Sequence, residues 1–410
     1  MQTLNKKGAF VIIGNGIAGT TCAEELAKRV SGQRIVLIGQ EPYPLYNRVA
    51  LPRFLKGQVR EEKVFLRTVE QHEQQGIELY LNTVVTHIDF TERKVVCQDG
   101  KEFQFSKLLI ATGGRPMPPP WPGETQELLQ FQTLDDTKQI IAIAEPGKTA
   151  AVIGNGLIAY ELAEGLRHRG LHVHWIIRGP RVLSNMLDDE GASLCQLLGE
   201  EAGVEFHIGE NPASIAKKNG KLQITTKPDR SYTVDMACYG IGLKFYLEFL
   251  ENSPININRG IVVNERLQTN VDNVYAAGDI AEYFDLMLGR HNIMGTWDNA
   301  EAHGKVAAAN MAGEPTAYND VPTYTTTMFH STLAVMGEIS NTNPDLKSYS
   351  RLNLEEKSYR KLYFKDNILV GVVMIGPPKG RKKLLELMQT KRPFDGKPED
   401  LLDPAYLATL

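Results

Sequence analysis

Two glycine-rich turns carry the clearest chemical signal in the chain. The first reads Gly14-Asn15-Gly16-Ile17-Ala18-Gly19, between an apolar β-type run at 10–13 and a helix-forming segment at 20–30. In such a strand–turn–helix, the first glycine permits the turn, the second lets the backbone approach a pyrophosphate, and the third lets helix and strand pack closely. N–H groups at the helix start then face the phosphates. The pattern predicts a dinucleotide site.

Glu41 supports this interpretation. It stands 22 residues after Gly19, just past a second apolar strand at 34–38. A carboxylate at that distance is placed to accept hydrogen bonds from a ribose. The alternative is a solvated loop glutamate.

The unit recurs at an offset of 140 residues. A strand at 150–153 leads into Gly154-Asn155-Gly156-Leu157-Ile158-Ala159 and a helix through Arg169. Both turns read Gly-Asn-Gly, and the repeat pairs Glu24 with Glu164. Each copy continues into short strands, at 76–114 and at 203–242, and Asn219-Gly220 within the second predicts a hairpin. We therefore predict two dinucleotide sites, one per repeat.

Length, composition and charge limit the classes of function that the chain can have. The 410 residues include 45 Lys+Arg and 49 Asp+Glu, a net charge of -4 that disfavours nucleic acid as the main partner. No apolar stretch approaches the length that spans a bilayer, and residues 1–8 lack a secretory pattern, so we expect a cytoplasmic protein with no membrane contact. The length predicts two to three domains.

Cysteines and histidines offer no further site. Cys22, Cys97, Cys195 and Cys238 are too scattered for a disulfide framework, a redox pair or a zinc site, and are expected to be buried. His168, His172 and His174 lie at a helix end and in the next strand, with nothing nearby to complete a ligand set. We expect no metal.

Two further segments reveal a family resemblance. With Ala111-Thr112-Gly113-Gly114-Arg115-Pro116 and Val274-Tyr275-Ala276-Ala277-Gly278-Asp279, the chain resembles the pyridine nucleotide-disulfide reductases in the broad sense. The resemblance implies an α/β fold of glutathione-reductase type, with two Rossmann-like dinucleotide-binding domains and a small α+β C-terminal domain. It implies an FAD domain at 1–115 and 245–322, an NAD(P)H domain at 116–244, and a C-terminal domain at 323–410.

The resemblance also assigns residues to the flavin. Asp279 would accept a hydrogen bond from a ribityl hydroxyl, although it also suits a helix N-cap before 280–284. Trp297 would lie beside the isoalloxazine, although tryptophan is also a common core residue. The implied FAD set is Gly14, Gly16, Ile17, Ala18, Gly19, Glu41, Arg48, Arg53, Ala111, Thr112, Gly113, Gly278, Asp279 and Trp297.

One segment indicates a branch of the family. Where disulfide reductases carry redox cysteines, this chain has a cysteine-free stretch at 43–55. It is similar to the rubredoxin and ferredoxin reductases and to the flavin portion of NADH-dependent nitrite reductase. It departs from them in having Pro52-Arg53 in place of Ser-Lys, and a basic surface loop is the alternative interpretation of Arg48 and Arg53.

The second turn raises the choice of nicotinamide nucleotide. The resemblance implies that Glu161 orients the amide group of the nicotinamide. The alternative is an exposed carboxylate in the first turn of the helix. Ile177 stands where an NADH-selecting acid is usual, and Arg178 or Arg181 could pair with a 2′-phosphate. The sequence therefore allows either NAD(H) or NADP(H) as the nucleotide. The resemblance to the rubredoxin and ferredoxin reductases favours NADH. The implied NAD(P)H set is Gly154, Gly156, Leu157, Ile158, Glu161, Arg178, Arg181, Gly240 and Gly242.

The C-terminal region resembles the family's third domain, with strands at 331–336, 360–364 and 369–375 and a helix at 381–390. Its basic cluster, Lys379, Arg381, Lys382 and Lys383, crowds the start of that helix, where cations oppose the helix dipole. We interpret it as a docking site for an acidic electron-transfer partner, with a merely solvating face as the alternative.

Together these features imply an enzyme that transfers hydride between NAD(P)H and FAD and exchanges single electrons with a rubredoxin, a ferredoxin or an iron–sulfur protein. One alternative is the NAD(H)-reacting flavin subunit of a multi-subunit iron–sulfur or metal oxidoreductase, in a hetero-oligomeric complex. Others are an NAD(P)H oxidase or quinone reductase, and a non-catalytic flavoprotein subunit with a degenerate nicotinamide site.

Overall fold

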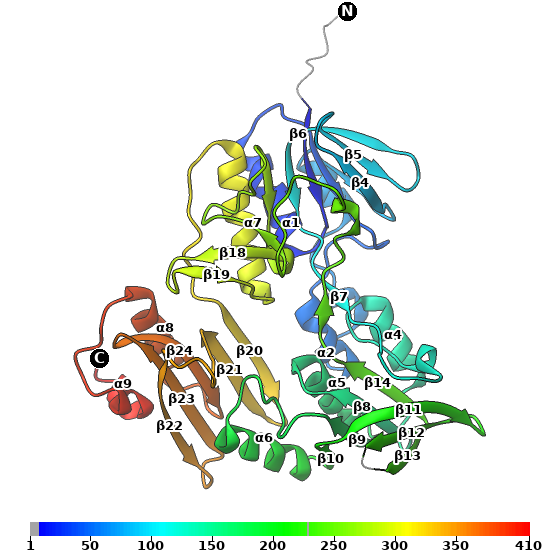
Figure 1. Ribbon diagram of the computed structural model, residues 1–410, viewed down its shortest axis with the longest axis vertical. Helices are drawn as coiled ribbons and strands as arrows, with labels where there is room; N and C mark the ends of the chain where they lie inside the picture. The colour runs from blue at the N-terminus through cyan, green and yellow to red at the C-terminus, as the bar shows by residue number, and fades with distance from the viewer. Residues whose placement is uncertain (1–7, 228) are drawn as a thin grey trace, which may run out of the picture. The chain divides into compact units, whose positions relative to one another are not determined.

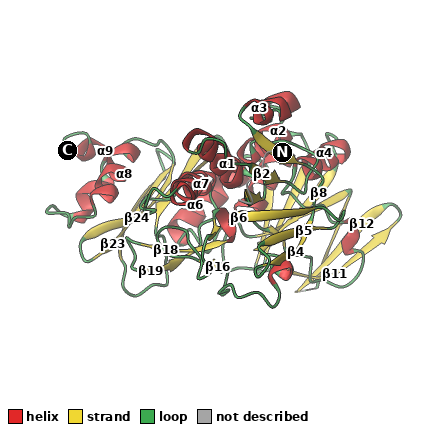
Figure 2. Cartoon of the chain, turned by 90° about the horizontal axis from the view of Figure 1, so that it is seen from above, coloured by secondary structure: helices red, strands yellow, loops and turns green. Residues whose placement is uncertain are grey.

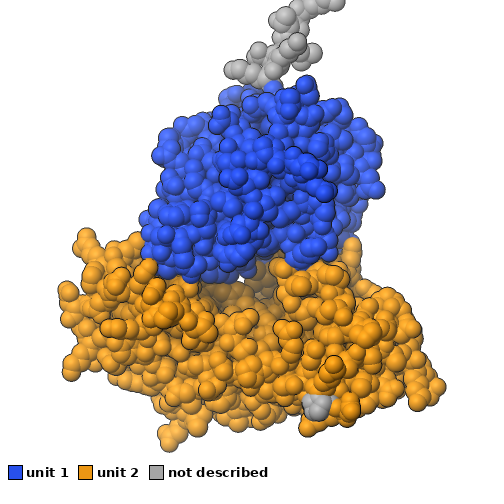
Figure 3. All heavy atoms as spheres, viewed as in Figure 1, with its two compact units in different colours: residues 1–47, 61–115, 244–322 blue, residues 48–60, 116–243, 323–410 orange. Residues whose placement is uncertain are grey.

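The computed structural model describes residues 8–227 and 229–410, so the expectation for the N-terminus falls largely outside the described residues. The chain forms two compact units (Figure 3). Unit 1 comprises residues 1–47, 61–115 and 244–322, and unit 2 comprises 48–60, 116–243 and 323–410. The segment 48–60 thus groups with the second glycine turn and the C-terminal region, whereas the sequence prediction assigned it to the FAD domain. The three-domain division stays a prediction.

Unit 1 is built on a mostly parallel sheet (Figure 1). Its strand order is β3 (Ile77–Tyr80), β2 (Ile35–Ile38), β1 (Ala9–Ile13), β6 (Glu102–Ile110), β5 (Lys94–Cys97) and β4 (Val85–Asp89), and β17 (Val274–Ala276) pairs with β6. Every residue of β1 and β2 is buried, as expected for parallel strands covered on both faces. Unit 1 also contains α3 (Val69–Gln74), β16 (Ile261–Val262), β18 (Ala281–Asp285) and β19 (Arg290–Asn292).

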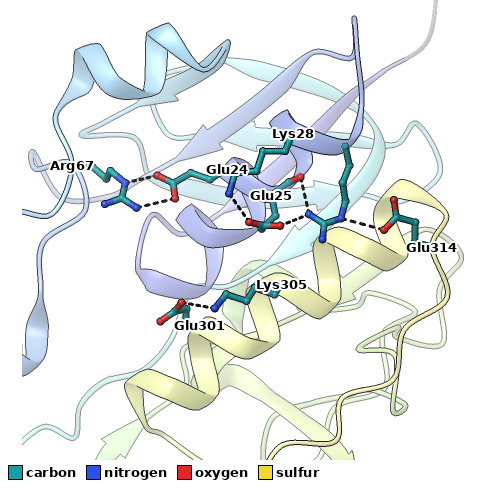
Figure 4. Close-up of polar contacts among 8 residues, drawn as sticks. Glu24, Glu25, Lys28, Arg67, Glu301, Lys305 and Glu314 are labelled. Atoms are coloured by element: carbon teal, nitrogen blue, oxygen red, sulfur yellow. Dashed lines mark hydrogen bonds and ion pairs between the residues drawn. The ribbon is translucent and has the colours of Figure 1, made fainter.

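Helices α1 (Ile17–Arg29) and α7 (Trp297–Ala312) lie side by side (Figures 1 and 2). Gly304 allows this approach, because a Cβ there would lie 2.4 Å from the Ala18 carbonyl oxygen. Ion pairs lie along these helices (Figure 4). Glu25 contacts Lys28 and Arg29 within α1, and Arg29 also contacts Glu314, just beyond the end of α7.

Unit 2 repeats the parallel arrangement on a smaller scale. Its sheet has the order β10 (Val204–Ile208), β9 (His172–Ile177), β8 (Thr149–Gly154) and β14 (Met236–Gly240), and its antiparallel sheet comprises β11 (Asn211–Lys218), β12 (Lys221–Lys227) and β13 (Arg230–Val234). The predicted hairpin is confirmed, because Asn219 and Gly220 join β11 to β12 with φ of 53° and 77°, as a type I′ turn requires. Four helices accompany these two sheets: α2 (Leu51–Leu55), α4 (Leu134–Ile143), α5 (Leu157–His168) and α6 (Asp189–Glu201).

Packing explains why α2 belongs to unit 2. Gly165 of α5 faces the Leu55 side chain so closely that a Cβ there would lie 2.5 Å from the Leu55 Cδ2. Arg169 Nη1 also donates to the Leu55 carbonyl oxygen at 3.0 Å. The short strands β7 (Arg115–Pro116) and β15 (Leu243–Lys244) fall at the chain positions where one unit gives way to the other.

The C-terminal region of unit 2 is an antiparallel sheet with helices, as predicted. Its strand order is β20 (Thr323–Met328), β21 (Ser331–Gly337), β24 (Ile368–Ile375), β23 (Ser358–Lys365) and β22 (Lys347–Asn353), followed by α8 (Arg381–Thr390) and α9 (Pro404–Leu407). Asp366 and Asn367 turn between β23 and β24 with φ of 49° and 61°. Among the described residues, no helix combines the length and apolarity that crossing a membrane requires.

Candidate dinucleotide-binding sites

The first glycine turn has the geometry that a pyrophosphate needs. Gly14 adopts a φ of 108°, and a Cβ there would lie 2.2 Å from the Ala111 carbonyl oxygen. At Gly16, by contrast, a Cβ would meet nothing within 4 Å. No side chain caps α1 and no acid occupies its first turn, so the helix N–H groups face open space. An anion fits this arrangement.

The second turn repeats these features. Gly154 adopts a φ of 140°, and a Cβ there would lie 2.1 Å from the Gly240 carbonyl oxygen. Gly156 borders open space, and no side chain caps α5. The third glycine position is Ala159, which is fully buried. The Gly240 carbonyl oxygen therefore lies beside Gly154 as the Ala111 carbonyl oxygen lies beside Gly14.

An asparagine in each turn holds the loop that follows the second strand of its repeat. Asn15 Nδ2 donates to the Tyr43 carbonyl oxygen at 2.8 Å, and Asn155 Nδ2 donates to the Arg181 carbonyl oxygen at 2.9 Å. Room for each amide is made by Gly39 and Gly179, where a Cβ would lie 2.5 Å and 2.8 Å from the respective asparagine. Sequence reasoning missed these two glycines, although their spacing of 140 residues was available as a signal.

Glu41 follows β2 and is half-buried. Its Oε2 accepts a hydrogen bond from Tyr46 Oη at 2.7 Å, and the Asn15–Tyr43 bond ties its loop to the glycine turn. Glu41 is therefore held by local contacts and is not merely solvated. Its role toward a ribose stays a prediction.

The Gly278-Asp279 segment reaches the start of α1. A Cβ on Gly278 would lie 3.2 Å from Ala18 Cβ, and one on Gly295 would lie 3.5 Å from the Asp279 carboxyl carbon. The N-cap interpretation of Asp279 is wrong, because 281–285 form strand β18 and not a helix. Trp297 is the first residue of α7 and is half-buried, so it is no core tryptophan.

The buried His303 contacts this segment, and sequence reasoning missed it. Its Nδ1 accepts the Gly278 N–H at 3.2 Å, and its ring lies edge-on to Tyr283 and Tyr318. Complete burial lowers the pKa of His303 to about 3, so the imidazole is neutral and can accept this hydrogen bond at any ordinary pH.

The two arginines of the 43–55 segment differ. Arg48 is half-buried and donates through Nη1 to the Gln132 carbonyl oxygen at 2.6 Å. Arg53 is exposed on α2, where Pro52 occupies a buried position in the first turn. The alternative interpretation, a basic surface loop, therefore fits Arg53 and does not fit Arg48. Thr112, the middle residue of the Ala-Thr-Gly segment, is also exposed, and Gly113 has a φ of 63°.

Glu161, the fifth residue of α5, is half-buried, so the interpretation of an exposed first-turn carboxylate is wrong. It accepts a hydrogen bond from Tyr324 Oη at 2.9 Å. Burial raises the pKa of Glu161 to about 7, because the charged form loses solvation that its hydrogen bonds with Tyr324 and Thr326 only partly replace. The side chain therefore changes charge near neutral pH.

A buried ion pair lies one turn further along the same helix. Lys56 Nζ contacts Glu164 Oε2 at 2.6 Å, with side-chain exposures of 4% and 11%. Glu164 also accepts the Phe329 N–H at 3.0 Å, and Lys56 donates to Thr327 Oγ1 at 3.0 Å. Sequence reasoning missed Lys56, which lies one helical turn after Arg53.

At the end of β9 the two candidate arginines are again unequal. Arg181 is committed to the protein, with Nε donating to the Leu187 carbonyl oxygen and Nη1 contacting Asp189, both at 3.0 Å. Arg178 is exposed, and within the described part of the chain no side-chain partner meets it. Gly242, the last residue of the predicted NAD(P)H set, adopts a φ of 111°.

Comparison with known families agrees with this geometry. A family model described as pyridine nucleotide-disulphide oxidoreductase matches residues 8–304. The chain belongs to this family. A second model, described as the rubredoxin NAD+ reductase C-terminal domain, matches residues 322–392, so the branch resemblance is confirmed as well.

The chain is also similar to individual proteins along most of its length. It is 29% identical to the assimilatory nitrate reductase electron transfer subunit of Bacillus subtilis, covering 97% of this chain and 51% of that protein. It is 30% identical to the ferredoxin–NAD(+) reductase component of the anthranilate 1,2-dioxygenase system of Burkholderia cepacia, covering 80% and 81%. The chain thus spans about half the length of the first of these relatives.

The fold matches that of a solved structure. The reductase in the covalent putidaredoxin reductase–putidaredoxin complex superposes with a TM-score of 0.92 at 24% identity, covering 99% of each chain. The expected α/β fold with a small C-terminal domain is confirmed.

The four cysteines of this family member form no redox pair. Cys22, Cys97, Cys195 and Cys238 are all free and buried, as predicted. Burial raises the pKa of Cys97 to about 11 and that of Cys195 and Cys238 to about 12, so these thiols stay protonated. None of them is placed as a nucleophile or a redox partner.

Proposed function

We propose that the chain is an FAD-dependent NAD(P)H:electron-carrier oxidoreductase, with FAD on the first glycine turn and NAD(H) or NADP(H) on the second. The observation that carries this proposal is the pair of open, uncapped helix starts at Gly16 and Gly156. When bound, the two cofactors supply hydride transfer and single-electron exchange. The chain's own residues would bind the phosphates, orient the rings and exclude water.

We propose a rubredoxin, a ferredoxin or an iron–sulfur protein as the electron acceptor. The match of residues 322–392 to a rubredoxin reductase C-terminal domain supports this choice. Buried, protonated thiols also leave no disulfide route for the electrons. The second candidate function is that of a flavin subunit in a larger complex. The similarity to the assimilatory nitrate reductase electron transfer subunit favours it. A cytoplasmic location stays the prediction from the sequence.

Anaerobic addition of NADH and of NADPH to the purified flavin-loaded protein tests the proposal. We expect bleaching of the flavin absorbance, followed by its recovery when an oxidised rubredoxin or ferredoxin is added. We expect NADH to be the faster donor. A large preference for NADPH, lost in Arg178→Ala, would assign Arg178 to the 2′-phosphate. No bleaching by either nucleotide would contradict the proposal and favour a non-catalytic subunit.

Glu161 predicts a pH dependence of nicotinamide binding. Because its pKa is raised to about 7, Glu161 is largely neutral at pH 6 and ionised at pH 8. Only the carboxylate accepts hydrogen bonds through both oxygens, so affinity for the nicotinamide amide should rise with pH through 7 and then level off. The dissociation constant, measured from flavin reduction rates at a series of pH values, checks this. Glu161→Gln should flatten the profile, and an unchanged step in that variant would assign the titration to another group.

The basic cluster predicts how the acceptor docks. Lys379 and Lys382 are exposed, while Lys382 and Lys383 contact Glu386 only weakly, at 4.0 Å and 3.8 Å. Lys379→Glu with Lys382→Glu should slow reduction of an acidic protein acceptor by about tenfold at low salt, while NADH-to-dye turnover stays unchanged.

A matched control reverses the same amount of charge elsewhere in unit 2. Lys218 and Lys227 are exposed on the β11–β12 hairpin. Lys218→Glu with Lys227→Glu should leave both activities intact. If both double variants slow protein-acceptor reduction equally, net charge is the cause and the basic cluster is not the docking site.

A further inference from the structure

A group of three metal-ligating side chains lies on β9 and β10, outside the residues assigned to the nucleotides. The strands are parallel, with Glu205 directly opposite His174. Because side chains alternate along a strand, His207 projects from the same face as Glu205. His174 Nδ1 lies 3.0 Å from His207 Nε2 and 3.2 Å from Glu205 Oε2, and all three ligand atoms lie within 4.8 Å of one another.

We propose that His174, Glu205 and His207 bind a zinc ion. Two imidazole nitrogens and a carboxylate oxygen are a donor set that zinc uses, with a fourth position left for water. Two such donors on one tetrahedral zinc lie roughly 3.4 Å apart, given bond lengths of about 2.0–2.1 Å. The two separations from His174 Nδ1 are close to that value. The expectation of no metal considered His168 and His172 with His174, and overlooked the partners supplied by the adjacent strand.

The proton on His174 Nδ1 cannot be shared fully with both of its neighbours. His174 Nδ1 carries at most one proton, yet two acceptors lie within 3.2 Å of it. If that proton goes to His207 Nε2, the Glu205 oxygen, on a side chain that is 65% exposed, is left to solvent; if His207 Nε2 donates instead, the Nδ1 lone pair faces the carboxylate. A cation at the centre satisfies all three atoms at once.

A further set of residues orients His207 as metal ligands are usually oriented. Its other nitrogen, Nδ1, lies 3.1 Å from Tyr232 Oη, and Tyr232 donates to Glu210 Oε2 at 2.9 Å. Because the Tyr232 proton goes to Glu210, Nδ1–H of His207 donates to Tyr232. The lone pair of Nε2 then points toward His174. Such hydrogen bonds to the distal nitrogen fix the tautomer and orientation of ligating histidines.

Isothermal titration of the chelator-treated, flavin-loaded protein with zinc chloride tests the proposal. We expect one equivalent to bind and the thermal midpoint to rise with zinc. His174→Ala should abolish both effects, and Tyr232→Phe should weaken binding by about 10–100-fold. His172→Ala is the matched control, because His172 is exposed two residues earlier on the same strand and lies outside the cluster.

Two outcomes would overturn the site. One is the absence of stoichiometric binding in the unaltered protein, which would leave a hydrogen-bonded cluster only. The other is undiminished binding in His174→Ala, which would place the zinc elsewhere. Glu205→Gln guards against misfolding, because this side chain is 65% exposed and its loss should weaken zinc binding without affecting the fold.

Discussion

Replacing Lys56 with methionine is expected to lower the free energy of unfolding by about 3–5 kcal/mol. The substitution leaves the Glu164 carboxylate buried without its cation, 2.6 Å from the lost ammonium. The Phe329 N–H and Thr327 hydroxyl remain as neutral donors, which compensate a buried charge only in part. Urea unfolding followed by circular dichroism measures the loss.

Two further variants isolate the cause. In Lys56→Met with Glu164→Gln, no charge is left buried and the amide oxygen can still accept the Phe329 N–H, so most of the stability should return. Lys217→Met breaks an exposed pair with Glu127, whose side chains are 49% and 37% exposed, and should cost at most about 1 kcal/mol. If Lys56→Met costs no more than Lys217→Met, the buried pair is not a determinant of stability.

The repeat made much of the fold predictable. Strands β1 and β8, helices α1 and α5, and both turns follow from local patterns, because each unit of strand, turn and helix is specified within about thirty consecutive residues. Turn chemistry was equally local: Asn219-Gly220 and Asp366-Asn367 adopt the positive φ values that their residue types favour.

The ion pairs that anchor the repeat were not predictable. Glu24 and Glu164 occupy the same position in α1 and α5, and the sequence shows that they match. It does not show that Glu24 pairs with Arg67 or that Glu164 pairs with Lys56. Arg67 lies 43 residues after Glu24, whereas Lys56 lies 108 residues before Glu164, so no fixed spacing identifies the partners. The same holds for His207, which meets His174 only because β10 pairs with β9.

Replacing Gly14 with alanine should prevent both flavin binding and stable folding of unit 1. The added Cβ would lie 2.2 Å from the Ala111 carbonyl oxygen and 2.6 Å from its carbon, both backbone atoms that cannot move aside cheaply. The φ of 108° adds strain that only glycine avoids. Together we expect a loss of more than about 3 kcal/mol. Flavin content after purification and the urea midpoint report the two effects.

Gly16→Ala separates folding from binding. The φ of -70° at Gly16 suits alanine, and a Cβ there meets no protein atom within 4 Å, so the urea midpoint of the flavin-free protein should match that of the unaltered chain. The methyl group would instead occupy the open space that the second glycine leaves for a pyrophosphate, so flavin affinity should fall by at least about tenfold. Full flavin retention in Gly16→Ala would show that the first turn is not the FAD site, whereas flavin loss together with unfolding would show that Gly16 also supports the fold.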